Sequence, residues 1–576
     1  MRDPGLMIAD TPSDPAERLE LSSQTLGALP IVCHFLDRMR VQVLLERHLP
    51  PPDARCRLQP ARAIGLLVRN LCVSHEPLYS LGEWAQPFDP ALLGLRAEEA
   101  AELGDDQVGR ALDRLFCADR ASLLTELVLG VIAAFEVDCS QLHNDSTSIT
   151  VHGAYRSADG HESAGQPTPA ICHGHNKDHR PDLKQLLWIL TVSADEAVPL
   201  AYRLTDGNTN DDQTHIGTWE GLRALVGYAD FLYVADCKLC TREQMVHIDQ
   251  RGGRFVTVLP RSRKEDGFLR DWVQTNTPQW SEAERKPGKR NDDPDQVWCT
   301  APAPIPSTEG YRIIWVRSSA KIGRDAQARQ QRIERGLEAL AELAARLAGP
   351  KSRLRTRQAV EQAAAAALDQ ASAERWIDFT VTETVHETYR QEKRGRPSKE
   401  TRYRKHTTTR FELQFTVNAD TVAYDAHTDG CFPLITNDRQ LADAELLAAY
   451  RYQPNLEKRH HQLKSVQDAA PVLLKSPERI EALFCCHFIA LLCCCLIERE
   501  LRQAMARQEI AELPLFPEQR ACKQPTAART LELFSGLARH RLYSDRRHLK
   551  DFAPALTPLQ AHVLQLLGVP AAAYTG

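Results

Sequence analysis

The chain has 576 residues, of which 43% are apolar and 26% charged, and its formal net charge at pH 7 is −5. This length is too great for one hydrophobic core, and the composition is that of a soluble globular protein without a long disordered tail. The net charge excludes a uniformly basic nucleic-acid coat, although local basic patches still allow DNA binding. The 16 cysteines lack the spacing of a disulfide framework and the N-terminus does not read as a signal peptide. We therefore expect a cytoplasmic protein with reduced cysteines.

The first region, residues 1–135, has the pattern of helices. Apolar residues between 27 and 50 fall near one helix face, and further helices are expected over 61–75 and 105–136. We predict an all-helical N-terminal domain. Helices with short loops suit a DNA-binding module and a structural domain equally well.

The pattern changes to β-strands at residue 137. Residues 213–228 read as a helix, and five apolar runs read as strands: Val137–Thr150, Leu186–Val192, Val198–Leu204, Phe231–Ala235 and Phe255–Leu259. Asp145 lies in the first strand, and Asp236 directly follows the fourth. Residues 136–261 are therefore predicted to form the first part of a mixed α/β core.

Residues 262–430 read as an inserted domain of strands and long helices. Helices are expected over Arg329–Leu347 and Thr356–Ala373, with strands at Tyr311–Val316, Trp376–Val385 and Phe411–Val417. A basic stretch, Lys393–Lys399, contains Arg394-Gly-Arg396-Pro, which resembles the AT-hook motif of the minor groove. Arginines are attracted by the negative potential of a narrow minor groove, so Arg394 and Arg396 are candidate DNA contacts. A solvated basic loop explains the same charges, and the sequence leaves both readings open.

The last part of the chain is expected to be helical. Residues 431–505 are assigned to the continued core, and 506–576 to a helical C-terminal region with a basic helix between Arg539 and Lys550. The cysteine-rich run Phe484–Ile497 is shorter than the roughly 20 residues that span a bilayer. We interpret it as a buried helix in which cysteine acts as a small hydrophobe, and expect no membrane association.

One helix of the continued core carries a chemical pattern. Pro454 is well placed to start it, and Glu457, His460 or His461, and Lys464 then share one face. A carboxylate and a cation on one face suit a metal-bound phosphate. An exposed helix with an ordinary charge pattern is the alternative.

Two other groups of residues are weaker candidates for metal sites. Cys237 and Cys240 form a lone C-x-x-C without a second ligand pair nearby. His173, His175 and His179 could form a metal cluster, but a phosphate-facing or plain surface loop fits them better.

Taken in order, these segments resemble the DDE transposases of bacterial insertion sequences. The resemblance is to the group with a Tyr-x2-Arg-x3-Glu-x6-Lys signature, which Tyr450, Glu457 and Lys464 match and in which Gln453 takes the Arg position. The surroundings of Asp145 and Asp236 are similar to the two catalytic Asp motifs. Segments 177–182 and 207–210 are similar to the region between them. Cys237-Lys238 differs from the Arg-Gly that usually follows the second Asp.

The resemblance implies a ribonuclease H-like catalytic core interrupted by a large insertion domain. It implies two Mg²⁺ ions, with Mn²⁺ as a substitute, bridged by Asp145 and bound individually by Asp236 and Glu457. Tyr450, Gln453 and Lys464 would contact the DNA backbone. The expected partners are double-stranded transposon ends and target DNA, held by a homodimer.

Two alternatives of other classes remain. The chain could be a catalytically inactive DNA-binding derivative that represses transposition. It could instead be a divalent-metal DNA nuclease that hydrolyses without joining. Three acids on separate segments speak against a mere binder, and a requirement for a specific terminal repeat would separate a transposase from a nuclease.

Overall fold

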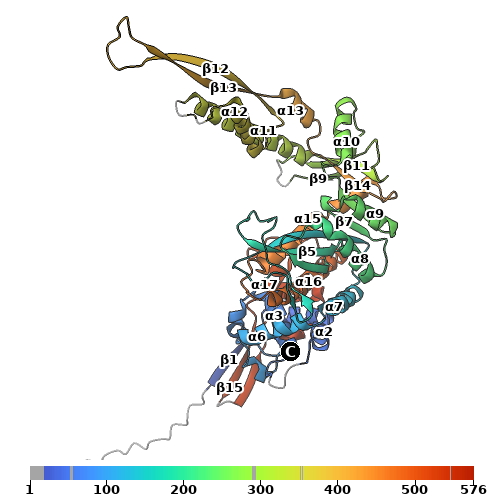
Figure 1. Ribbon diagram of the computed structural model, residues 1–576. Helices are drawn as coiled ribbons and strands as arrows, with labels where there is room; N and C mark the ends of the chain where they lie inside the picture. The colour runs from blue at the N-terminus through green and yellow to red at the C-terminus, as the bar shows by residue number, and fades with distance from the viewer. Residues whose placement is uncertain (1–18, 52–55, 289–292, 350–351, 353, 545–546) are drawn as a thin grey trace, which may run out of the picture. The chain divides into compact units, whose positions relative to one another are not determined.

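The computed structural model describes all residues except 1–18, 52–55, 289–292, 350, 351, 353, 545 and 546. It is a mixed α/β protein with two compact units, one made of residues 1–255 and 449–576 and the other of residues 256–448 (Figure 1). Each unit is described by itself.

The first unit has a helical layer built around α16 (Pro477–Arg507). This helix begins with Ser476, whose side chain accepts a hydrogen bond from the Arg479 N–H, followed by Pro477 in the first turn. The helices of the N-terminal region are α1 (Leu29–Arg38), α2 (Val41–His48), α3 (Pro60–Val73), α4 (Leu81–Ala85), α5 (Ala97–Ala100), α6 (Asp105–Cys117) and α7 (Arg120–Phe135). Among them, α1, α3 and α6 contact α16.

The cysteine-rich run lies in α16, and its burial is confirmed. Cys485, Cys486, Cys493 and Cys495 have no exposed surface. The helix is 31 residues long, more than the run alone predicts, and is the one described helix apolar enough to cross a membrane by length and composition. Because 89% of its most apolar window is buried inside the protein, it has the character of a core helix.

The N-terminal region is not an all-helical domain, contrary to the sequence prediction. Its first described element is the strand β1 (Leu19–Thr25), which pairs antiparallel with β15 (Ala538–Ser544) from Leu19 opposite Ser544 to Thr25 opposite Ala538. The pairing partner lies about 500 residues further along the chain, so no local pattern could reveal it.

The basic helix expected between Arg539 and Lys550 is also wrong. This segment forms β15 and β16 (Arg547–Phe552), an antiparallel pair that completes a three-stranded sheet with β1. Arg541 lies 3.5 Å from Asp551 across the pair. The helices of the C-terminal region are α17 (Ala527–Glu532), α18 (Pro558–Leu567) and α19 (Ala572–Thr575).

The sheet of the first unit is mixed. Its strand order is β6 (Pro199–Asp206), β5 (Lys184–Ser193), β2 (Gln141–Val151), β7 (Leu232–Ala235). The first three pair antiparallel, whereas β7 runs parallel to β2. These strands confirm the predicted ones, because long apolar runs bounded by turns form buried strands.

Further helices of this unit are α8 (His215–Val226), α9 (Arg242–Gln250) and α15 (Gln453–His461), with a minor two-stranded hairpin β3 (Glu162–Ser163) and β4 (Gln166–Pro167). The helix α14 (Asp443–Tyr450) lies mostly in the second unit. Short 3₁₀ turns lie at Leu78–Ser80, Asp211–Gln213 and Cys237–Leu239, and a π-helical turn at Gln462–Val466.

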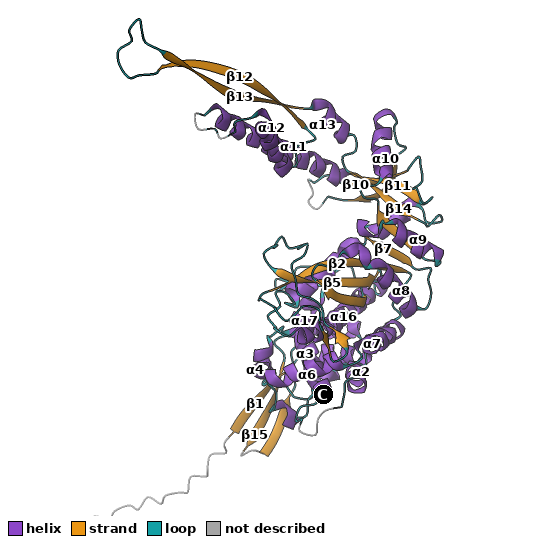
Figure 2. Cartoon of the chain, viewed as in Figure 1, coloured by secondary structure: helices purple, strands orange, loops and turns teal. Residues whose placement is uncertain are grey.

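The second unit has its own strands and helices (Figure 2). Its strands β8 (Arg254–Val258), β14 (Cys431–Thr436), β11 (Arg312–Ser318), β10 (Gln296–Pro302) and β9 (Ser281–Lys286) follow one another in this spatial order. Its helices are α10 (Lys264–Thr275), α11 (Ser319–Ala348), α12 (Arg357–Ala371) and α13 (Ala419–Ala426).

Two long strands in this unit form a separate antiparallel ribbon, β12 (Ile377–Gln391) and β13 (Tyr403–Val417). Its inner half packs on α11 and α12 through a core that contains Leu340, Leu368, Val381 and Leu413. Its outer half is exposed at almost every position. The predicted strands were shorter, because the outer half is exposed on both faces and lacks the regular apolar alternation of a half-buried strand.

Candidate active site

Asp145 and Asp236 are brought together by the pairing of β2 and β7. The parallel register places Asn144 opposite Ala235, so that Asp145 and Asp236 are the next residues on the two strands. Neighbouring strands lie about 4.8 Å apart. Asp236 ends its strand and caps the following 3₁₀ turn, its Oδ1 accepting a hydrogen bond from the Lys238 N–H at 3.0 Å. The two aspartates therefore lie side by side at the end of a parallel pair, a place where α/β proteins bind ligands.

Asp145 is held in surroundings that disfavour its charge. Its side chain is 21% exposed. Burial raises the pKa of Asp145 to about 6, and the charges of Asp236 and Asp211 add to the rise, while Lys177 and the Ser146 N–H oppose it. A carboxylate in this state is stabilised by an added cation.

Lys177 supplies a cation beside Asp145, on a side chain that is 33% exposed. Its Nζ donates to the carbonyl oxygen of Ser146 at 2.6 Å and to the Ser146 hydroxyl at 2.8 Å. The same Nζ lies 3.7 Å from Asp145 Oδ1 and 3.4 Å from Asp211 Oδ2. Sequence reasoning placed Lys177 only in a segment of family resemblance and did not single out Asp211. Their proximity follows from loops that fold over β2, which no local spacing encodes.

A buried histidine lies on the other side of Asp145. His460 Nε2 is 3.9 Å from Asp145 Oδ2. Burial, together with the positive charges of Lys177 and Lys464, lowers the pKa of His460 to about 3. The imidazole is therefore neutral at physiological pH and does not offset the charge of Asp145.

The helix that carries Glu457, α15, is fixed to β2 by Gln453. Gln453 is 8% exposed, its Nε2 donates to the Asn144 carbonyl at 3.3 Å, and its Oε1 lies 3.0 Å from His143 Nδ1. The sequence predicted a DNA contact for Gln453, and such a contact would require these bonds to break. The position next to Pro454 in the first turn explains why this side chain points back to the sheet.

A second anchor holds the other end of α15. Arg459 Nη1 lies 2.5 Å from Glu498 Oε2 of α16, and both side chains are almost completely buried. Arg459 also donates to the carbonyl oxygens of Glu196 and Ala197 at 2.7 and 3.1 Å. Because each nitrogen of the guanidinium donates to at least one acceptor, this buried charge is compensated.

Tyr450 lies within the electrostatic field of the three predicted ligands. Burial raises the pKa of Tyr450 to about 12, and Asp236, Cys237, Glu457 and Asp145 contribute to the rise in that order. The phenol therefore stays protonated and can donate a hydrogen bond. Glu457 itself is exposed on α15.

The three acids do not form one compact ligand set in this structure. Over the part of the chain that is described, no group of three or more His, Cys, Asp or Glu side chains is placed to hold a metal ion. This applies to Asp145, Asp236 and Glu457, to the predicted histidine cluster, and to the Cys237–Cys240 pair. The fold thus gathers the two aspartates, and the role of Glu457 as a third ligand stays a prediction.

The α-helix that carries Glu457 ends before Lys464. It ends at His461 and the chain passes into a π-helical turn over Gln462–Val466. The predicted face shared by Glu457 and Lys464 stays a prediction. Lys464 Nζ contacts both carboxylate oxygens of Asp178, at 2.6 and 2.7 Å. Its predicted phosphate contact stays a prediction.

Arg394 and Arg396 lie in the second unit, in the exposed loop between β12 and β13. Their predicted DNA contact stays a prediction.

Comparison with known proteins gives few matches. Residues 21–129 match a family model described as "Domain of unknown function (DUF4277)". No curated protein matches the chain. Among solved structures, the chain is similar to the piggyBac transposase synaptic complex with hairpin DNA, with a TM-score of 0.33, 8% identity, and coverage of 89% of this chain and 82% of that chain. At this low score the proposals below depend on the chain's own residues.

Proposed function

We propose that the chain is a DDE-type transposase that binds the ends of its insertion sequence, cleaves the DNA and joins the 3′-OH ends to target DNA. The observation that carries this proposal is the pair Asp145 and Asp236, set side by side by the β2–β7 register, with the Glu457 helix anchored on the same strand. The charges of neighbouring aspartates repel one another, so the pair is suited to binding a cation.

The strand order of the first unit supports a ribonuclease H-like core. Three antiparallel strands, β2, β5 and β6, are followed by β7 on the other side of β2 and parallel to it. This order places the first and second aspartates of the proposed site on adjacent strands.

The two aspartates fit a hard divalent cation. Carboxylate oxygens are the ligands that Mg²⁺ and Mn²⁺ prefer, and the burial that raises the pKa of Asp145 means that a nearby cation would stabilise its charged form. In the proposal Asp145 and Asp236 hold the metal, and Glu457 completes the set when DNA is bound. Bound Mg²⁺ or Mn²⁺ would align and neutralise the oxygens of an in-line phosphoryl displacement.

The other residues of the site would position the DNA. Tyr450, which stays protonated, donates its hydroxyl hydrogen to a phosphate oxygen. Lys464 exchanges its carboxylate partner Asp178 for a phosphate of the DNA. A hydrogen bond between the ammonium group and a phosphate is strong because both groups are charged. Water attacks the phosphodiester first, and the freed 3′-OH then attacks the target strand in the same site. The expected assembly is a cytoplasmic homodimer on two double-stranded DNA ends.

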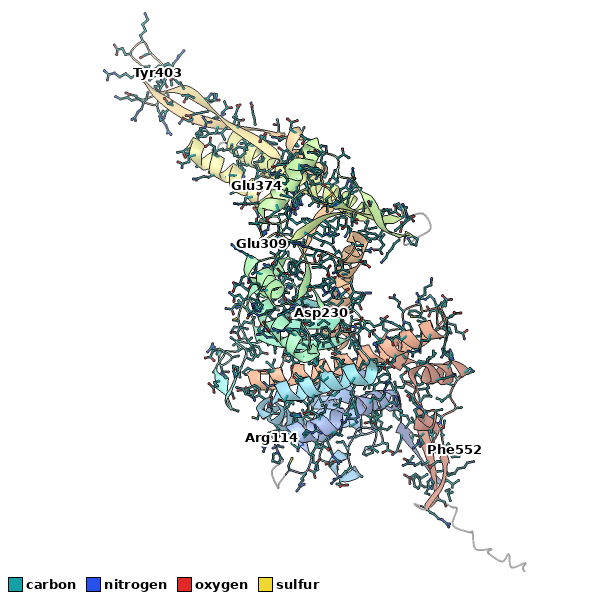
Figure 3. The ribbon with its side chains drawn as sticks, turned by 90° about the vertical axis from the view of Figure 1, so that its right-hand side faces the viewer. Arg114, Asp230, Glu309, Glu374, Tyr403 and Phe552 are labelled. Atoms are coloured by element: carbon teal, nitrogen blue, oxygen red, sulfur yellow. The ribbon has the colours of Figure 1, made fainter. Side chains whose placement is uncertain are left out.

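The test is a cleavage and joining assay with full-length protein, Mg²⁺ and labelled duplexes that carry the element's ends. Asp236→Asn is compared with Asp230→Asn, which removes one exposed carboxylate just before β7 (Figure 3). We expect Asp236→Asn to bind DNA and not cleave it, and Asp230→Asn to do both. Normal cleavage by Asp236→Asn would show that the assignment is wrong.

The wild-type protein separates the alternative functions in the same assay. Cleavage without joining would identify a divalent-metal nuclease. Binding without cleavage in either Mg²⁺ or Mn²⁺ would identify a catalytically inactive DNA-binding derivative.

A further inference from the structure

The ribbon of the second unit extends well past the helices that support it. In Figure 1 the strands β12 and β13 continue beyond α11 and α12 to the loop that joins them. From Thr384 opposite Arg410 to Gln391 opposite Tyr403 the pairing is unbroken. At about 3.3 Å per residue this outer half is roughly 25 Å long.

The two faces of this outer half differ in chemistry. Residues that pair across an antiparallel ribbon project from the same face, and successive pairs alternate. One face, here named the cationic face, consists of Thr384, His386, Thr388, Arg390, Arg404, His406, Thr408 and Arg410. It contains no acidic residue. The opposite face continues the side that packs on α11 and α12 and carries exposed Val385, Tyr389 and Tyr403. Tyr403 is labelled in Figure 3.

The arginines of the cationic face have no ion-pair partner among the described residues. Two other arginines of this unit are paired, Arg329 with Asp429 at 2.6 Å and Arg375 with Asp425 at 2.9 Å. On the ribbon itself, Lys405 of the opposite face lies 2.5 Å from Glu387. The cationic face therefore has charges that the protein leaves uncompensated.

One pair of this face is unfavourable by itself. Arg390 and Arg404 are directly opposite each other. Like charges in directly opposed positions destabilise a sheet pair. The joining loop adds to the positive charge, since residues 392–402 contain five Lys or Arg and two Glu. Both features are explained if the ribbon binds a polyanion.

We infer that the outer half of the β12–β13 ribbon is a DNA-binding arm whose cationic face lies against a groove of double-stranded DNA. The inference rests on the proposed function, because it names a surface that would hold the same DNA. A two-stranded ribbon fits the major groove, which is about 12 Å wide. Arginine, histidine and threonine supply donors for phosphates and base edges. Single-stranded DNA would call for aromatic stacking, and the exposed aromatic residues lie on the other face.

The test measures binding of the full-length protein to a labelled duplex of arbitrary sequence over a series of salt concentrations. Arg390→Gln/Arg404→Gln removes two charges from the cationic face and relieves the like-charge pair, so the ribbon should still form. The matched control, Arg335→Gln/Arg346→Gln, removes two exposed charges from α11. Thermal melting and analytical ultracentrifugation report folding and oligomeric state.

We expect the ribbon variant to lose about two phosphate contacts. The slope of log K against log salt should become shallower by about 1.8, so that the loss of affinity between about 50 and 200 mM salt shrinks roughly tenfold. The control should keep the wild-type slope.

An unchanged slope and affinity in the ribbon variant would overturn the inference. A changed oligomeric state with an unchanged slope would do the same and would identify the ribbon as a contact between subunits. A shallower slope in a protein that never cleaves DNA would support the arm and contradict the proposed catalysis. Loss of cleavage in Asp236→Asn together with an unchanged slope in the ribbon variant would support the proposed catalysis and contradict the DNA-binding arm.

Discussion

The ammonium group of Lys177 lies 3.7 Å from the carboxylate of Asp145, the first proposed metal ligand. The same group lies 3.4 Å from Asp211, so that one cation interacts with two carboxylates. An ion bound by Asp145 would have to share these oxygens with Lys177 or displace it. Lys177 therefore sets the balance of charge at the site before any DNA arrives.

Lys177→Met should bind Mg²⁺ more tightly than the wild-type protein, because a positive charge close to the proposed ligand is removed. We expect an increase in affinity of about tenfold or more, from a charge pair at about 4 Å in partly buried surroundings. Without Mg²⁺ the variant should melt at a lower temperature than the wild type. Calorimetric titration and melting curves with increasing Mg²⁺ measure both effects.

Lys184→Met is the control for this experiment, because Lys184 contacts the Ala154 carbonyl at 2.7 Å on the exposed side of β5. Equal Mg²⁺ affinity in the wild type and in Lys177→Met would mean that Asp145 does not bind the ion.

Asp145 should make the protein less stable as pH rises. Its pKa in the folded chain is about 6, above the ordinary value of 3.8. Between about pH 4 and pH 6 the folded state thus holds more protons than the unfolded state, and the free energy of unfolding falls with rising pH. Asp145→Asn lacks this effect and should be more stable at pH 7, by at most about 3 kcal/mol.

The measurement is the difference in melting behaviour between Asp145→Asn and wild type from about pH 4 to 7, without divalent ions. Burial lowers the pKa of His143 to about 4 and that of His460 to about 3. These histidines destabilise the fold as pH falls below about 6.5, whereas Asp145 destabilises it as pH rises. Both proteins contain the histidines, so their effect cancels in the difference. A difference that does not grow with pH, or that Asp230→Asn reproduces, would contradict the assignment.

Gln453→Leu should impair catalysis and spare DNA binding. The substitution leaves the Asn144 carbonyl and His143 Nδ1 without their buried partner, at a penalty of about 1–3 kcal/mol. Because α15 carries Glu457, even a small shift of the helix should lower the cleavage rate by about tenfold to a hundredfold. Cleavage rates at saturating protein and separate binding curves distinguish the two effects.

Asn455→Leu is the control for the change in polarity. It replaces an amide side chain by leucine two residues further along the same helix. If Gln453→Leu instead loses DNA affinity while bound DNA is cut at the normal rate, Gln453 contacts DNA as the sequence predicted.

Glu498→Ala should destabilise the first unit strongly. It leaves Arg459, which is 5% exposed, as a buried charge without its carboxylate, and it removes the acceptor of the Ala527 N–H at 2.9 Å. Loss of one partner of a buried pair lowers the free energy of unfolding by about 3–5 kcal/mol. Thermal and denaturant unfolding measure the change.

Lys458→Ala, the exposed neighbour of Arg459, should change stability by no more than about 0.5 kcal/mol. A similarly small effect of Glu498→Ala would mean that water or another group replaces the carboxylate.

The sequence by itself determined the elements whose pattern is local. Long apolar runs predicted the strands that carry Asp145 and Asp236, and the cysteine-rich run predicted a buried helix, because burial on one or both faces leaves a periodic trace in the chain. The spacing around Tyr450 and Glu457 likewise indicated a helix that bears an acid. These are properties of neighbouring residues, and a reader of the chain can count them.

Only the tertiary structure decided which distant segments meet. The pairing of β1 with β15 made strands of two regions predicted to be helical. The local sequence of an edge strand does not reveal which distant strand it pairs with. The β2–β7 register set the two aspartates side by side, while a loop brought Lys177 and Asp211 to the same carboxylate. The pairing of β12 with β13 sorted a basic stretch into a cationic face and an aromatic one. In each case long-range backbone pairing fixes which charges become neighbours, and a charge acts through its distance in space rather than its separation in sequence.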